Sequence, residues 1–290
     1  MDVHQTTIRV LGRITRVLEA GERSARDPVV MIHGVGGWAE NWREVMGPIA
    51  RTGRRAIAVD LPGFGESEPA GRVSYFGARD AFYPRFMTAL LDELGITTAH
   101  LVGSSMGGAV AYMTAVTVPA RTRSLVLVAS GGLGADLALF LRLTTLPGMT
   151  TLARLFGRPA HGRAVLRTCF FDPARIPEAL YAEAERYGFR SYPEFVRVLR
   201  SAVTLRGVRA DLRRHWITQA GRYRGPVLVV WGREDAVLPI GHLDAAKEVF
   251  PQAEVQVLER CGHLPMIERT DDYMAALAPF LDRAETPLAA

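Results

Sequence analysis

The sequence lacks several features that would place it in a specialised class of protein. It has no run of about 18 consecutive apolar residues, because charged residues, proline and glycine interrupt even the most hydrophobic stretch, residues 133–155. The first residues form neither a basic segment nor an apolar one, so we expect no secretory signal. The cysteines are Cys169 and Cys261 alone, which we expect to be free thiols in a cytoplasmic protein.

Other absences exclude classes of site. The sequence has no cysteine, histidine or carboxylate spacing typical of a metal centre and no Gly-rich nucleotide loop, so we expect neither a metal nor another cofactor. Nucleic-acid binding would need clustered basic and aromatic residues on a known module, and none is present. With 290 residues and 48% hydrophobic content, the chain can bury a large core and fold as one domain with an inserted lobe.

The net charge of +5 is unevenly distributed. Residues 142–224 contain 16 arginines against 6 acidic residues, a local balance of +10, which leaves the rest of the chain at −5. Such a segment could attract anionic lipid headgroups or acidic substrates, although a solvated helix face is the more common explanation for scattered arginine. We therefore expect at most a weak contact between this segment and an anionic membrane surface. A homodimer is left open.

Short apolar runs alternate with helix-like segments along most of the chain. A hairpin is expected over residues 6–19, followed by strands at 29–33, 56–60, 100–103, 125–129, 227–231 and 255–258. The helices expected between them are 41–50, 78–94, 106–117, 242–250 and 271–282. This alternation predicts an α/β fold, with a mostly parallel sheet covered by helices on both faces.

The alternation stops after residue 130. About ninety residues separate the strand at 125–129 from the strand at 227–231, far more than a normal crossover needs. Helical patterns at 177–187 and 192–203 indicate that this stretch is folded. The sequence therefore predicts a core of residues 1–132 and 225–290, with a helical cap of residues 133–224 inserted after the strand at 125–129.

Residues 103–107 read Gly-Ser-Ser-Met-Gly and match the G-x-S-x-G nucleophile elbow between an expected strand and an expected helix. A sharp turn at this place exposes the hydroxyl of Ser105, and glycine at both ends leaves room for it. The following helix would add backbone N–H groups and the positive end of its dipole. The context predicts that Ser105 is a nucleophile, whereas Ser104 is better explained as a polar residue at the strand end.

A serine hydroxyl needs a base to take its proton and a carboxylate to orient that base. Asp235 lies in a G-x-x-D-x-x-x-P frame directly after one strand, and His263 follows the last strand. Glu234 is an alternative to Asp235, and His33, His242 and His215 are alternatives to His263. Position after the strands favours Asp235 and His263, in the order Ser, Asp, His.

These motifs resemble those of the α/β-hydrolase superfamily over nearly the whole chain outside the cap. Residues 33–37 look like its H-G-x-G oxyanion loop, residues 60–67 look like its D-x-P-G-x-G-x-S signature, and the serine, aspartate and histidine fall on its triad positions. The resemblance implies that the backbone N–H groups of Val35 and Met106 form the oxyanion hole.

The resemblance implies a serine hydrolase, and hydrolysis of a carboxylic ester follows most directly from the residues. The chain also resembles both monoacylglycerol-lipase-type esterases and the hydrolases that cleave carbon–carbon bonds in meta-ring-fission products. The second group usually has Asn before the nucleophile and Trp after the histidine, where this chain has Ser104 and Leu264. Ester hydrolysis is therefore placed first, carbon–carbon hydrolysis second, and an acyltransferase or perhydrolase on the same triad stays open.

Substrate preference depends mainly on the cap and the pocket lining. The leucines and phenylalanines of the cap favour an apolar acyl or aromatic substrate, although packing between cap helices explains them equally well. Gly36, Phe170 and Phe171 are predicted to contact the substrate.

Overall fold

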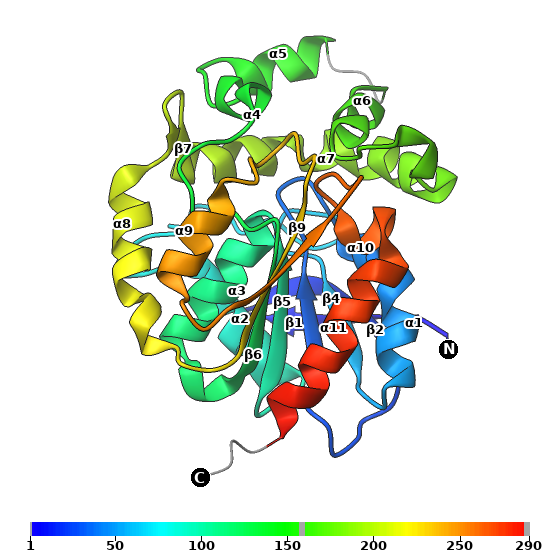
Figure 1. Cartoon of the computed structure of the whole chain (residues 1–290). Coiled ribbons are helices and arrows are strands. Elements are labelled where there is room, and N and C mark those ends of the chain that lie inside the picture. The colour runs from blue at the N-terminus through cyan, green and yellow to red at the C-terminus, as the bar shows by residue number, and fades with distance from the viewer. Residues whose placement is uncertain (1, 157–159, 287–290) are drawn as a thin grey trace.

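The computed structural model describes residues 2–156 and 160–286, and an eight-stranded sheet forms its centre (Figure 1). The spatial order of the strands is β1-β2-β4-β3-β5-β6-β9-β10. The pairs β1–β2 and β2–β4 are antiparallel and the other neighbours are parallel, which confirms the predicted α/β fold with a mostly parallel sheet. The bounds are β1 His4–Val10, β2 Arg13–Ala20, β3 Val29–Ile32, β4 Ala56–Val59, β5 Ala99–Ser104, β6 Thr122–Val128, β9 Val227–Gly232 and β10 Glu254–Leu258.

The inner strands are buried on both faces, because their side chains alternate between two apolar layers. In β3, Val30 and Ile32 belong to one hydrophobic cluster, whereas Val29 and Met31 belong to the other. Both layers bury branched apolar side chains, which explains why these strands appear in the sequence as continuous apolar runs.

Helices cover both faces of the sheet. On one face lie α2 (Phe82–Glu93) and α3 (Met106–Thr117), and on the other lie α1 (Arg43–Arg51) and α11 (Thr270–Glu285). A 3-10 turn at Ala39–Trp42 precedes α1, and two further helices are α9 (His242–Val249) and α10 (Pro265–Glu268). Each predicted core helix is present with small shifts at its ends.

The inserted segment lies mainly above the carboxyl edge of the parallel strands (Figure 1). It contains α4 (Leu139–Leu143), α5 (Met149–Phe156), α6 (Ala160–Thr168), the long α7 (Glu178–Ala202), a short hairpin of β7 (Val203–Thr204) and β8 (Gly207–Val208), and α8 (Ala210–Gln219). The two helical patterns at 177–187 and 192–203 form one continuous helix, α7, which contains Pro193.

The last helix of the segment predicted to be a cap, α8, packs against the core. Helix α8 runs down beside the sheet instead of standing above it (Figure 1), and the indole of Trp216 donates to the carbonyl of Phe76 at 3.0 Å. Trp216 also belongs to the main hydrophobic cluster. The end of the insertion is therefore packed as part of the core.

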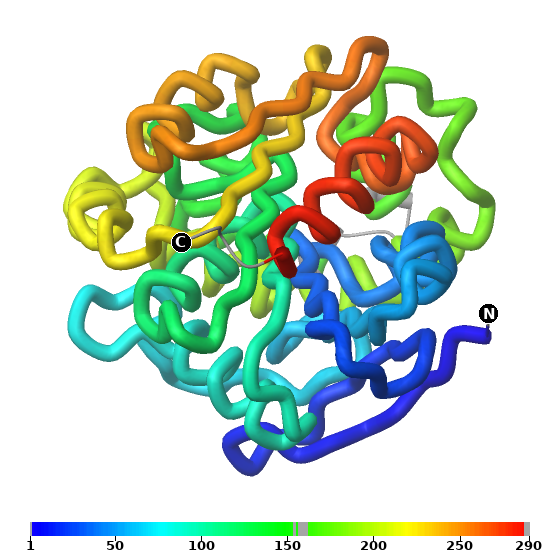
Figure 2. Tube along the Cα trace, turned by 60° about the horizontal axis from the view of Figure 1, so that its bottom comes forward, coloured from blue at the N-terminus to red at the C-terminus, as the bar shows by residue number. Residues whose placement is uncertain are grey.

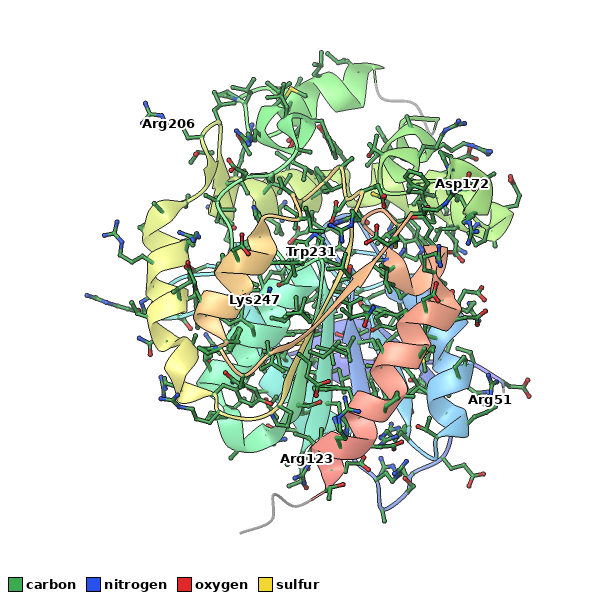
Figure 3. The ribbon with its side chains drawn as sticks, viewed as in Figure 1. Arg51, Arg123, Asp172, Arg206, Trp231 and Lys247 are labelled. Carbon is green, nitrogen blue, oxygen red and sulfur yellow. The ribbon has the colours of Figure 1, made fainter. Side chains whose placement is uncertain are left out.

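Figure 2 shows the N-terminal hairpin in blue along one side of the molecule, so the antiparallel part of the sheet is an outer edge. Trp231, at the end of β9, is fully buried, whereas Arg206 in the turn between β7 and β8 points outward (Figure 3). Among the helices of residues 2–156 and 160–286, none is both long enough and apolar enough to cross a membrane.

Candidate active site

Ser105 lies at the turn between β5 and α3, in a backbone conformation that few non-glycine residues adopt. Its φ of 55° and ψ of −121° are those of the first central position in a type II′ turn. A Cβ added at Gly103 would lie 2.1 Å from the carbonyl oxygen of Gly107, and one added at Gly107 would lie 2.1 Å from that of Ile32. Both glycines are therefore needed for the elbow, as the motif predicts.

His263 and Asp235 form a direct hydrogen bond at the same edge of the sheet. The imidazole Nδ1 donates to Asp235 Oδ2 at 2.7 Å, and both side chains are buried. The other carboxylate oxygen accepts the backbone N–H groups of Val237 and Leu238 at 2.8 and 2.9 Å. Because the carboxylate holds the proton on Nδ1, Nε2 is left as the basic nitrogen.

Glu234, the alternative carboxylate, has a different task. Its side chain accepts the backbone N–H of Cys261 at 2.9 Å, which ties the loop after β9 to the loop after β10. The structure therefore pairs His263 with Asp235 and uses Glu234 for loop geometry.

Ser105 and His263 line the same cavity. Both side chains are described, yet no hydrogen bond joins the hydroxyl of Ser105 to the imidazole. Such bonds are often long in unliganded enzymes and shorten when substrate binds. Of the histidines whose side chains the structure describes, His263 alone lines this cavity, whereas His33 is fully buried and His215 contacts the ring of Trp216 edge to face.

The loop after β3 lies against the nucleophile. A Cβ added at Gly34 would lie 2.9 Å from that of Ser105, so only glycine permits this approach. Val35 and Ser105 line both cavities of the site, and Met106, the first residue of α3, lines the smaller one. The two backbone groups predicted for the oxyanion hole therefore flank Ser105.

His33 holds this loop from behind. Its Nδ1 lies 2.7 Å from the carbonyl of Gly34, and its Nε2 accepts the N–H of Leu61 at 2.9 Å. Burial lowers the pKa of His33 to about 4, so the ring is neutral and can serve as donor at one nitrogen and acceptor at the other. A bracing role, rather than that of the base, fits this geometry.

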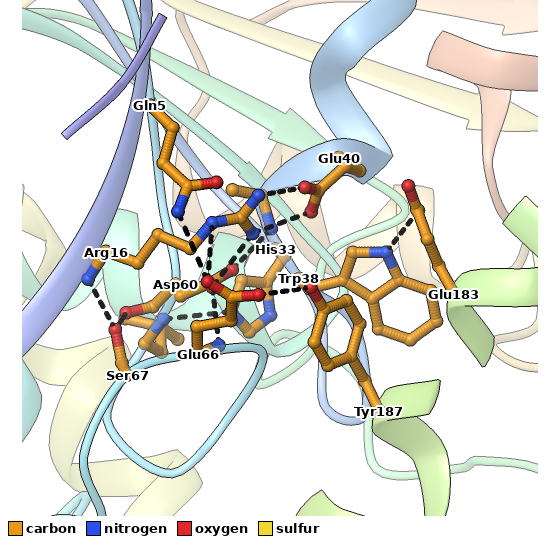
Figure 4. A network of polar contacts seen from close by, with 12 residues as sticks. Gln5, Arg16, His33, Trp38, Glu40, Asp60, Glu66, Ser67, Glu183 and Tyr187 are labelled. Carbon is orange, nitrogen blue, oxygen red and sulfur yellow. Dashed lines mark hydrogen bonds and ion pairs between the residues drawn. The ribbon is translucent and has the colours of Figure 1, made fainter. Parts of the chain in front are cut away.

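A buried ionic network supports the same loop (Figure 4). Arg16 donates to both Glu40 and Asp60, and the other oxygen of Asp60 accepts the N–H of Ala39 at 2.7 Å. The oxygen of Asp60 that Arg16 contacts also accepts the N–H of Glu66, at 2.9 Å. Burial raises the pKa of Asp60, while these N–H groups and the charge of Arg16 oppose the rise.

The cap helix α7 is bonded to this network. The indole of Trp38 donates to Glu183 at 2.7 Å, and Glu66 accepts from the hydroxyl of Tyr187 at 3.0 Å (Figure 4). Glu66 also accepts from Arg186 at 2.8 Å. Farther along α7, Glu194 accepts a hydrogen bond from Tyr75 of the core. The loop after β3 and the inserted segment are thus joined by one network of hydrogen bonds and ion pairs.

Glu268, on α10, is a supporting residue that the sequence analysis missed. Its buried carboxylate accepts the backbone N–H groups of Gly262, Asp172 and Phe171 at 2.7, 2.7 and 3.2 Å. It joins the loop that carries His263 to the cap. A lone glutamate after the last motif gives no sequence signal for this role.

Two cavities meet at Ser105. The larger has a volume of about 460 Å³ and the smaller one of about 110 Å³. Of the described residues that line the larger cavity, most are apolar, none is Arg, Lys, Asp or Glu, and His263 is the sole histidine. Gly36, predicted to contact substrate, lines this cavity. Ser104 and Leu264, which stand where the carbon–carbon hydrolases usually have Asn and Trp, line it as well.

The structure does not place Phe170 or Phe171 on either cavity. Phe170 is buried in a separate apolar cluster between cap and core, and Phe171 is exposed beneath the guanidinium of Arg260. The backbone N–H of Phe171 is held by Glu268, whereas that of Phe170 donates to the carbonyl of Arg167. The neighbouring Cys169 does line the larger cavity, and its carbonyl accepts the N–H of His263 at 2.7 Å.

Within the described ranges, no group of three or more His, Cys, Asp or Glu side chains is arranged to hold a metal ion. Cys169 and Cys261 are free thiols in the structure. Burial raises the pKa of Cys169 to about 12, so this thiol on the cavity wall is a poor nucleophile.

Comparison with known sequences gives one family and two kinds of relative. A model of the alpha/beta hydrolase fold matches residues 27–270. A 2-hydroxy-6-oxononadienedioate/2-hydroxy-6-oxononatrienedioate hydrolase of Comamonas testosteroni is 32% identical over 91% of this chain and 89% of its own length. A dihydrolipoyllysine-residue acetyltransferase component of the acetoin cleaving system of Pseudomonas putida is 34% identical over 93% of this chain and 67% of its own.

Solved structures show the same fold. A 2-hydroxy-6-oxo-6-phenylhexa-2,4-dienoate hydrolase from Rhodococcus sp. strain RHA1 is similar with a TM-score of 0.78 and 25% identity, covering 97% of this chain and 99% of that one. The curated relatives favour the carbon–carbon alternative over the ester hydrolysis that the sequence analysis placed first. A family model that spans most of the residues, with relatives above 30% identity over nearly the whole length, establishes that this chain belongs to the α/β-hydrolase family.

Proposed function

We propose that this hydrolase cleaves carboxylic esters of apolar substrates through Ser105, His263 and Asp235. The observation that carries the proposal is that Ser105 lies between two largely apolar cavities with a paired His263–Asp235 at the wall of one of them. Ser105 Oγ attacks the acyl carbon while His263 accepts the hydroxyl proton. The N–H groups of Val35 and Met106 meet the charge that develops on the carbonyl oxygen, and losing one such donor typically costs about 100- to 1000-fold in turnover.

The two cavities hold different parts of the substrate in this proposal. His263 must give its proton to the leaving oxygen, and it lines the larger cavity only, so the alcohol belongs there. The acyl group then lies in the smaller cavity beside Met106. Water next attacks the acyl carbon and gives a proton to His263. His263 then gives this proton to Ser105 Oγ as the bond between Oγ and the acyl carbon breaks, which releases the acid and restores the hydroxyl.

Hydrolysis of a carbon–carbon bond in a ring-fission product is the second candidate, and the curated relatives are the observation that favours it. The dienoates in their names are carboxylates, and a buried carboxylate needs a cation or several donors. The described lining of the larger cavity, where a leaving dienoate would lie, contains neither Arg nor Lys, and Arg213 stands on the smaller cavity. Ser104 and Leu264 also line the larger cavity, where the resemblance would have Asn and Trp. The place of the cation and these two differences are why ester cleavage stays first.

An acyltransferase or perhydrolase would use the same residues, and acetyltransferase components are among the relatives. Adding a competing alcohol or peroxide to the ester assay distinguishes these activities, because a transferase yields a new ester or a peracid instead of the free acid.

Labelling by a fluorophosphonate, combined with a substrate panel, tests the proposal. Wild type is expected to be labelled and to hydrolyse apolar esters, and Ser105→Ala is expected to do neither. The panel includes esters of increasing acyl length and one ring-fission dienone. Faster turnover of the dienone than of every ester would replace the first candidate by the second, and labelling of Ser105→Ala would end both.

We also propose a weak contact between the outer cap and an anionic lipid surface. Exposed apolar side chains gather on the cap, among them Leu139 and Leu143 on α4, and Leu152 and Leu155 on α5. The segment around them has the excess of arginine noted above. The protein should sediment with anionic vesicles at low salt and stay in the supernatant at high salt. Binding that does not depend on salt would contradict an electrostatic contact.

A further inference from the structure

The smaller cavity sets a tight limit on what it can hold. A cavity of about 150 Å³ accommodates benzene, so one of 110 Å³ takes about four or five heavy atoms. Its walls are mainly apolar and come largely from α3, α7 and α8, and Ser105 lines it as well. An acyl chain that starts at the carbon attached to Ser105 Oγ would fill it after a few bonds.

One charged residue stands in this apolar lining. Arg213, on α8, is half-buried, and its Nε donates to the carbonyl of Leu133 at 2.5 Å. Within residues 2–156 and 160–286, no carboxylate lies within ion-pair distance of its guanidinium. The bond through Nε fixes the plane of the group and leaves its Nη donors for another acceptor.

A phenol hydroxyl lies near the same cation. Tyr112 lines the smaller cavity, and its hydroxyl is buried with no hydrogen-bond partner in the described part of the chain. Burial raises the pKa of Tyr112, and the charge of Arg213 opposes that rise. A buried hydroxyl without a partner is costly unless a ligand satisfies it, and the half-buried guanidinium beside it can bind an anionic group at the same place.

We propose that Arg213 is a specificity-determining residue that receives a carboxylate at the far end of the acyl group. The preferred acyl group is then a short dicarboxylic one of about succinyl size, which places five heavy atoms beyond the reacting carbonyl. This inference rests on the proposed ester hydrolysis and on the assignment of the acyl group to the smaller cavity. It narrows the apolar ester proposed above to an apolar alcohol, held in the larger cavity, joined to an acyl group that ends in a carboxylate.

Two esters of one alcohol test the inference. Octyl hemisuccinate and octyl 4-methylpentanoate carry acyl groups of equal size, and only the first ends in a carboxylate. Wild type is expected to show a kcat/KM about 10-fold or more in favour of the hemisuccinate, the effect of a charge-assisted hydrogen bond. The reverse preference would overturn the inference.

Variants assign the preference to a residue. Arg213→Gln should lower kcat/KM for the hemisuccinate by about 10- to 100-fold and change it little for the 4-methylpentanoate. Arg213→Lys keeps the charge and should retain part of the preference. This variant separates the loss of the charge from the loss of the hydrogen bond to Leu133. Arg214→Gln, an exposed arginine on the same helix, is the matched control and should change neither rate.

The outcomes separate the inference from the proposed function. Equal losses on both esters in Arg213→Gln, with Arg213→Lys no better, would overturn the role of Arg213 and leave ester hydrolysis standing. A wild type that is labelled at Ser105 but hydrolyses neither ester would also overturn the inference. If Ser105 is not labelled either, the proposed function fails with it.

Discussion

Replacing Glu268 by Gln should both destabilise the fold and impair the site. The carboxylate accepts three backbone N–H groups, at 2.7, 2.7 and 3.2 Å, while 3% exposed. Hydrogen bonds to a charged group contribute about 1.5–3 kcal/mol each, and an amide can still accept at one oxygen. Its NH₂ group, however, would face at least one of the donors. We therefore expect a loss of about 2–4 kcal/mol in the free energy of unfolding.

The effect on activity follows from the position of Gly262, which precedes His263. A shift of about 1 Å in a catalytic group can cost about 100-fold in rate, so kcat should fall by about 10- to 100-fold in the folded variant. Urea unfolding and ester hydrolysis below the unfolding transition measure the two effects separately.

Glu259→Gln is the matched control. Glu259 lies near the end of β10 and is bonded to Arg233, but both side chains are more than half exposed. Exposed ion pairs contribute about 0–1 kcal/mol, so this variant should be nearly as stable as wild type. If Glu268→Gln matches it in stability and keeps full kcat, the carboxylate does not organise the His263 loop.

Three further predictions follow from other contacts. Gly34→Ala should lower kcat about 100-fold, because its methyl meets Ser105, whereas Gly241→Ala, whose methyl meets nothing within 4 Å, should not; equal rates would contradict the close approach. Trp38→Phe and Glu183→Gln should show a coupling of about 0.5–1.5 kcal/mol in a double-mutant cycle of unfolding, and simple additivity would deny their bond. Burial lowers the pKa of His100 to about 4, so its unfolded form takes up a proton below about pH 6.5 and stability falls as the pH drops toward 4. His100→Gln should flatten the dependence of unfolding on pH in that window, and an unchanged slope would refute the assignment.

Much of the architecture could be predicted from the sequence because local patterns and global fold agree. Continuous apolar runs such as Val29–Ile32 reflect burial on both faces. Glycine at 103 and 107 reflects a close approach of backbone, because an added Cβ at either position would lie 2.1 Å from a backbone carbonyl oxygen. Asp235 and His263 directly follow their strands, so their proximity at one edge of the sheet could be predicted without knowledge of the cap.

The cap residues that line the cavity could not be predicted, because apolar residues in this segment either pack between helices or face the cavity. Phe170 and Phe171 are aromatic residues of the kind that often line a pocket. Phe170, however, is buried in another cluster, and Phe171 is exposed. Adjacent residues in an irregular segment point in different directions, and a single sequence holds no period from which to tell them apart. Glu268 was missed for a related reason, since its partners are backbone groups, which leave no side-chain motif.

The turn at Ser105 has a consequence for how far this protein can be stabilised. A non-glycine residue held in such a sparsely populated conformation costs about 1–3 kcal/mol, which the surrounding contacts must offset. Glycine accepts these angles without that cost. Ser105→Gly is therefore expected to yield an inactive protein with a higher melting temperature than wild type. Selection for thermal robustness alone would act against the nucleophile, so robustness and turnover compete at this one position.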